Sequence, residues 1–322
     1  NSLAALTWEP QYWSYPFTHL PTGLWTSVLV GTTCGVLGCF VVLRRMALIG
    51  DALSHAILPG VVIAFLVTNN TGVWGLLLGA LLAGLMTAVL INVVSHNSRT
   101  KEDSAIGIVF TALFALGLIL ISMLPRGTHF DLKCFVFGIP EAVTFAEFSL
   151  MAGIAIVVLG TITLLYHPLK LISFDPIVAT AMGLPVLFFH YLLMGMISAT
   201  VVAGLKTTGV ILVVAMVITP ASAAYQITNR FSNMLILAGF FGALSALLGT
   251  ILAYVLNAPS GPSMVLAATF IFVASMLFSP THGYVFEKLR KARLKRHIEG
   301  EDILKALYKL ENSGQASTRE NI

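Results

Sequence analysis

Apolar residues dominate this chain in long runs, and short polar stretches separate the runs. A run of about 20 apolar residues crosses the hydrocarbon core of a bilayer as an α-helix. The second run is short and the seventh contains Pro220, so either can be broken or re-entrant, and we expect eight to nine spans. The predicted spans are 24–43, 53–68, 73–94, 105–124, 148–167, 185–205, 208–227, 233–256 and 262–280. Between them, longer loops are predicted at 125–147 and 168–184.

Composition agrees with this pattern, since 57% of the 322 residues are hydrophobic and 10% are charged. The basic residues then indicate the orientation. With the C-terminus inside, the inner segments hold fifteen Lys and Arg, and the outer segments hold only Arg126, Lys133 and Lys206. Cytoplasmic segments retain basic residues, so we predict the N-terminus outside and the C-terminus in the cytoplasm. The net charge of +4 reflects this topology and does not indicate nucleic-acid binding.

Three regions follow from these patterns. Residues 1–22 are rich in aromatic side chains and are predicted to lie at the outer membrane interface. Residues 23–280 form the predicted all-α polytopic membrane domain. Residues 281–322 form a basic, helical tail that is predicted to lie in the cytosol against anionic lipid.

Signatures of the common enzyme classes are missing from the sequence. No histidine is followed by Glu, so there is no HExxH motif, and neither GxSxG nor GxxxxGK[ST] occurs. The three cysteines suggest neither a disulfide framework nor a metal site. We therefore predict that the chain is not an enzyme, and that any ATP is bound by another chain.

One stretch, "RRMALIGDALSHAILPG" at 44–60, places an acid and a histidine four residues apart inside a predicted span. Residues at that spacing share one helical face, so Asp51 and His55 can present a carboxylate oxygen and an imidazole nitrogen to one point. That ligand pair suits Mn²⁺, Fe²⁺ or Zn²⁺. Two ligands are too few for a metal, so a second copy of the chain related by a two-fold axis would supply two more.

A structural alternative explains the same stretch. "GDALSHA" also has the pattern of a helix start, with Asp51 as the N-cap that bonds to the amide near Ser54, and His55 as a buried side chain. From the spacing alone the two interpretations stand level. A further histidine within a span, His190, is expected to lie at the interface and not to bind a metal.

Four separated motifs together resemble the membrane permeases of the zinc/manganese/iron ABC importers. They are "RRMALIGDALSHAILPGVVIAFL", "TKEDSAIGIVFTALFALG", "SFDPIVATAMGLPV" and "TTGVILVVAMVITPASAAYQITNRF", and the likeness extends over roughly residues 24–280. The resemblance implies a type II ABC importer-like permease in the bacterial cytoplasmic (inner) membrane. It further implies a second permease subunit, two cytoplasmic ATP-binding subunits and an extracytoplasmic metal-binding protein as partners.

The resemblance also assigns residues. It implies that Asp51 and His55 lie in the translocation path, which favours metal binding over capping. The cargo it implies is Mn²⁺, with Zn²⁺ or Fe²⁺ as alternatives, and no cofactor is expected to be bound permanently. The ATPase-coupling segment it implies is the loop after the seventh span, with Ala221, Ser222, Ala223, Ala224, Arg230 and Phe231.

Two other functions compete with the ATP-driven importer. In a proton-coupled secondary carrier of divalent metals, Asp51 would be the proton site, and the chain would transport without an ATPase. An intramembrane hydrolase would need His55 for cleavage of a substrate, and the missing enzyme motifs argue against it.

Overall fold

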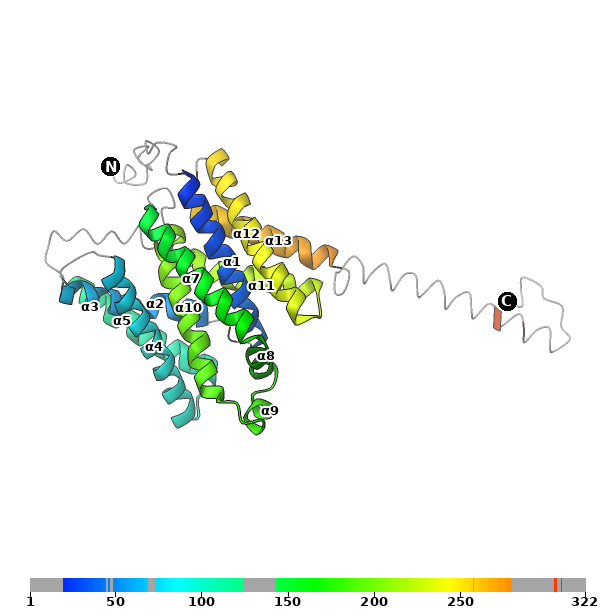
Figure 1. Cartoon of the computed structure of the whole chain (residues 1–322), viewed down its shortest axis with the longest axis horizontal. Coiled ribbons are helices and arrows are strands. Elements are labelled where there is room, and N and C mark those ends of the chain that lie inside the picture. The colour runs from blue at the N-terminus through cyan, green and yellow to red at the C-terminus, as the bar shows by residue number, and fades with distance from the viewer. Residues whose placement is uncertain are drawn as a thin grey trace, which may run out of the picture.

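The structure is a computed structural model, and it describes residues 20–44, 46, 49–68, 73–123, 143–256, 258–279, 304, 305 and 308. Every regular element in these ranges is an α-helix, and together the helices form one elongated bundle (Figure 1). In chain order the helices are α1 (Leu20–Leu43), α2 (Ile49–Ala56), α3 (Leu58–Thr68), α4 (Val73–Asn97), α5 (Glu102–Ser122), α7 (Phe145–Leu164), α8 (Tyr166–Phe174), α9 (Pro176–Ala181), α10 (Val186–Thr208), α11 (Val210–Ile227), α12 (Phe231–Leu256) and α13 (Ser260–Phe278).

The predicted number of spans is confirmed. Within the described residues, eight helical segments are long and apolar enough to cross a membrane, counting α2 and α3 together as one. A shorter apolar helix, Val213–Ile227 within α11, corresponds to the seventh predicted span, 208–227. The chain is therefore an all-α, multi-pass membrane protein. The predicted terminal regions, 1–22 and 281–322, fall largely outside the described residues, as does most of the predicted loop 125–147.

Of the two doubtful spans, the second is interrupted and the seventh is not. α2 ends at Ala56 and α3 begins at Leu58, two residues before Gly60. Pro59 has no N–H, so it cannot donate to the His55 carbonyl one turn earlier, and this weakens the helix at that point. At Gly60 the backbone of α4 comes so close that an added Cβ would overlap the carbonyl oxygen of Gly79. By contrast, α11 continues through Pro220.

Glycines on α1 allow the closest packing in the bundle. An added Cβ at Gly35 would lie 3.0 Å from the carbonyl carbon of Ala238 on α12, and one at Gly38 would lie 2.8 Å from that of Val217 on α11. Helices in a membrane gain little from hydrophobic burial and depend on such close backbone contacts. α1 is therefore the central helix against which α11 and α12 pack (Figure 1).

The stretch 168–184, predicted as an inner loop, is mainly helical, so the prediction of a loop was wrong. The end of α8 and the whole of α9 occupy it, at the lower end of the bundle in Figure 1. Asp175 caps α9 by accepting hydrogen bonds of 3.0 Å from the amides of Ile177 and Val178. Pro176, which follows it, has the fixed φ that suits the first position of a helix.

Candidate metal site and its surroundings

α2 is a short helix held inside the bundle. It packs against α5, α10, α11 and α4. Six of its eight residues are buried, and the two that remain partly open are Asp51 and His55. The side chain of Asp51 is 45% exposed and that of His55 is 29% exposed. The buried face of α2 thus anchors the helix, while its one open face carries the predicted ligand pair.

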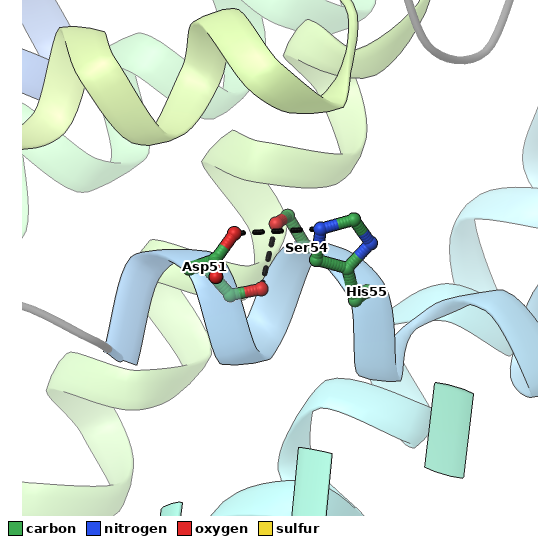
Figure 2. A network of polar contacts seen from close by, with 3 residues as sticks. All are labelled: Asp51, Ser54 and His55. Atoms are coloured by element: carbon green, nitrogen blue, oxygen red, sulfur yellow. Dashed lines mark hydrogen bonds and ion pairs between the residues drawn. The ribbon is translucent and has the colours of Figure 1, made fainter. Parts of the chain in front are cut away.

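The two predicted ligands face each other across one helical turn. Nε2 of His55 lies 3.4 Å from Oδ1 of Asp51 (Figure 2). The hydroxyl of Ser54, which is fully buried, donates a 2.8 Å hydrogen bond to the Asp51 carbonyl oxygen. That bond holds the turn from which both ligands project, because it ties residue 54 to residue 51.

The capping interpretation of Asp51 was wrong. α2 begins at Ile49, whose amide bonds to the Met46 carbonyl, so Asp51 is the third residue of the helix and not its cap. A carboxylate in the first turn is still favourable, because the amide dipoles leave partial positive charge there. Neither role requires the histidine, so the facing carboxylate and imidazole remain unexplained by helix formation alone.

Two aromatic rings from α5 lie against the imidazole. The ring centroid of His55 is 5.0 Å from that of Phe114, with the planes at 69°, and 5.8 Å from that of Phe110, with the planes at 39°. Sequence analysis missed both phenylalanines. Their spacing of four residues was visible in "TKEDSAIGIVFTALFALG", but a lipid-facing helix has the same spacing, so the sequence could not pair them with His55.

The described residues of one chain would supply only part of a metal site. Among the described residues, no group of three or more His, Cys, Asp or Glu side chains is close enough to hold a metal ion. Asp51 and His55 therefore offer two ligands, one oxygen and one nitrogen. A Zn²⁺ or Mn²⁺ ion held there would need further ligands, from another chain or from water, to reach its usual four or more.

The predicted coupling segment is not a loop over most of its length. α11 extends to Ile227, so Ala221, Ala223 and Ala224 are helical, and all three are fully buried. The short turn that follows ends at Arg230, which is exposed. The remaining two predicted residues differ in burial, since Ser222 is half-buried and Phe231, the first residue of α12, is buried.

Phe231 joins this turn to other helix ends through aromatic contacts. Its ring lies 5.3 Å from that of Phe40 at the end of α1, 5.8 Å from that of Tyr166 at the start of α8, and 5.8 Å from that of Phe174 at the end of α8. Burying several large rings together fixes these ends relative to one another. The start of α12, the end of α1 and α8 therefore pack together at one end of the bundle, and α9 packs against α8.

That end carries exposed apolar side chains that sequence analysis did not single out. Ile177 on α9 is 80% exposed, and Phe174 and Met182 beside it are also exposed. The signals for the helix itself, Asp175 followed by Pro176, were present in the sequence. Because α9 lies outside the predicted spans, these exposed apolar side chains are candidates for contact with another chain or with lipid.

His190, predicted at the interface, lies at the start of α10 and is half-buried. Its Nδ1 is 3.4 Å from Nη1 of Arg44, at the end of α1. Because a guanidinium can only donate, Nδ1 of His190 accepts in this contact. His190 thus helps to join α1 to α10, and it does not belong to the group formed by Asp51 and His55.

Comparison with known proteins places the chain among metal permeases. Residues 16–279 match the model of a family described as the ABC 3 transport family. The manganese transport system membrane protein MntC of Halalkalibacterium halodurans is 47% identical over 279 residues, covering 87% of this chain and 94% of that protein. The chelated iron transport system membrane protein YfeD of Yersinia pestis is 36% identical, covering 87% and 90%. Among solved structures, PsaBC from Streptococcus pneumoniae in complex with Fab matches with a TM-score of 0.76 at 38% identity, covering 84% of this chain and 96% of that chain.

Proposed function

The chain belongs to the ABC 3 transport family, a family of membrane permeases of metal importers, and we propose that it is the permease of an ATP-driven importer whose cargo is Mn²⁺. Manganese is the transported metal in the printed name of the relative that is 47% identical, while YfeD is named for chelated iron. A carboxylate oxygen and an imidazole nitrogen suit Mn²⁺, and they also suit Fe²⁺ and Zn²⁺ as competing cargo.

The observation that carries this proposal is the burial pattern of α2. Ionisable side chains within a membrane are costly, so they occur where they face an aqueous path or a binding partner. Every other side chain of α2 is buried, and only Asp51 and His55 are partly open. This arrangement favours a cation path along the open face of α2, with the carboxylate and the imidazole as ligands.

The same two residues call for a second subunit. In a two-fold symmetric pair of permeases, the open faces of the two α2 helices would meet at the axis and complete an Asp₂His₂ site for one cation. The cation would be shared between subunits and released when the two faces separate. The homodimer is the simplest such pair, because it supplies the two missing ligands without another kind of chain.

Transport driven by ATP requires further chains, since this sequence has no phosphate-binding loop. Two ATP-binding subunits would dock on the cytoplasmic end, and an extracytoplasmic protein would deliver the metal to the other end. Burial reduces the set of predicted coupling residues that a partner can contact. Arg230 is exposed, whereas Ala221, Ala223 and Ala224 are covered by this chain. We therefore include α8 and α9 in the docking surface, because Phe174 at the end of α8 contacts Phe231, next to Arg230, and Ile177 on α9 is exposed.

The test is uptake of Mn²⁺ into liposomes that contain the permease, its ATPase and its binding protein. The importer requires ATP and is inhibited by vanadate, whereas a secondary carrier would transport in response to a proton gradient without the ATPase. Asp51→Asn and His55→Ala should abolish uptake while the complex still assembles. Uptake that survives in Asp51→Asn would show that the carboxylate does not bind the cargo, because Asn keeps the shape and loses the charge.

A further inference from the structure

The phenylalanines against His55 belong to one stripe of α5 that follows α2 and α3. Phe110 and Phe114 share a helical face, and Gly117 lies one turn further along it. An added Cβ at Gly117 would lie 3.0 to 3.1 Å from three side-chain carbons of Leu58, the residue at which α3 begins. The contact at Leu58 sets the position of α5 along its axis relative to α2 and α3. That position places the two phenylalanine rings opposite the His55 imidazole.

From this geometry we propose that Phe110 and Phe114 are specificity-determining residues of the cation path, which hold the His55 imidazole in position and make a cation shed water before it binds. The inference rests on the proposed role of Asp51 and His55 as cargo ligands. It assigns two further residues to the cation path, Phe110 and Phe114. These residues neither bind the metal nor carry charge.

The positioning part follows from the ring geometry. An imidazole with two open sides turns freely about its bond to Cβ, so Nε2 would face Asp51 only part of the time. Edge contact with Phe114 and tilted contact with Phe110 remove that freedom. The 3.4 Å separation between Nε2 and Oδ1 is then a preformed gap into which a cation can be received.

The selectivity part follows from hydration. The rings cover His55 more than Asp51, so a cation reaches the open carboxylate first and meets the imidazole against an apolar wall. Mg²⁺ gives up its water reluctantly and prefers oxygen ligands, whereas Mn²⁺, Fe²⁺ and Zn²⁺ bind imidazole readily. An apolar wall that admits little water at the imidazole therefore disfavours Mg²⁺ more than it disfavours Mn²⁺.

The experiment measures equilibrium binding of Mn²⁺ to the purified permease and ATPase complex, with Mg²⁺ as the competitor. The metal-binding protein is left out, because it selects metals itself. The variants are Phe114→Leu and Phe110→Leu. Phe270→Leu on α13 is the matched control, because Phe270 is exposed on a different helix.

We expect Phe114→Leu to weaken Mn²⁺ binding about 2- to 12-fold, the range that the loss of one aromatic pair allows. A lower ratio of Mg²⁺ to Mn²⁺ should then be enough to displace Mn²⁺ from the complex. Phe110→Leu should change both quantities in the same direction, whereas Phe270→Leu should leave them near the wild-type values. If Phe114→Leu does not assemble, Phe110→Leu decides the question by the same two quantities.

Three outcomes overturn the inference, and they are distinguishable. Unchanged Mn²⁺ affinity and unchanged Mg²⁺ competition in both leucine variants, together with lost binding in His55→Ala, would reject the aromatic wall and leave the proposed metal site standing. Wild-type binding in His55→Ala would reject the metal site itself and the inference with it. An equal change in Phe270→Leu would show a general effect on folding and would also reject the wall.

Discussion

Substituting Gly38 by Ala tests the close packing of α1 against α11. Gly38 lies on α1 where α11 crosses it, and α11 leads directly into the predicted coupling turn. An added Cβ would overlap the Val217 carbonyl oxygen, lie 2.8 Å from the Val217 carbonyl carbon, and lie 3.0 Å from the Cβ of Ala221. Ordinary contacts begin near 3.4 Å, so α1 and α11 would have to separate by about 0.6 Å or more.

The separation has a cost that can be estimated. Overpacking of a tightly packed interior typically destabilises by about 1–3 kcal/mol, and here the obstacle is backbone, which cannot rotate away as a side chain can. The backbone obstacle selects the upper part of that range, about 2–3 kcal/mol. The better helix propensity of Ala would return about 1 kcal/mol, so the net loss should be about 1–2 kcal/mol. Because Phe40 and Phe231 pack near the same end, the loss should also reduce coupling of ATP hydrolysis to uptake.

The assay is denaturant unfolding of the purified permease in detergent micelles, followed by tryptophan fluorescence. The matched control is Gly153→Ala on α7, where an added Cβ meets nothing within 4 Å. Gly153→Ala should be neutral or slightly stabilising, because only the propensity term remains. Equal unfolding midpoints for the two alanine variants would refute the claim that α1 and α11 touch through their backbones at Gly38.

Three further predictions address the site and its partners. Ser54→Ala should destabilise the permease by about 0.5–1.5 kcal/mol, the usual contribution of one hydrogen bond, and should lower uptake without changing metal preference; a changed preference would mean that the Ser54 hydroxyl touches the cation. Ile177→Asp on α9 should leave the permease folded and release the ATPase during co-purification, since it places a charge on an apolar docking surface, and retention of the ATPase would exclude α9 from that surface. Arg230→Ala should uncouple ATP hydrolysis from uptake at unchanged metal affinity, whereas altered affinity would place Arg230 in the cation path.

The spans could be predicted from the sequence because the bilayer imposes one simple rule. Apolar runs of sufficient length had to be helices, and the chain follows that rule at each predicted span that the structure describes. The interruption near Pro59 was also visible, because proline removes one backbone donor. The stretch 168–184 was misjudged because hydropathy says nothing about short helices outside the apolar runs, although Asp175 and Pro176 carried a start signal.

The candidate site was predictable only in part, because some of its contacts depend on how the helices pack in the tertiary structure. A spacing of four places Asp51 and His55 on one face, and the structure brings their side chains within 3.4 Å. The same spacing could not say whether Asp51 capped the helix, because that depends on where the chain turns before Ile49. Nor could it reveal Phe114 beside His55, since that contact joins two helices and depends on how α5 packs against α2.

The central claim is that Asp51 and His55 of two permease subunits together hold one transported cation. The measurement is the number of Mn²⁺ ions bound per permease chain in the purified permease and ATPase complex, determined by equilibrium dialysis for the wild type and for His55→Ala. A shared site predicts one ion for every two permease chains in the wild type and loss of that ion in the variant. One ion bound within each chain, or an ion count unchanged by His55→Ala, would contradict the claim.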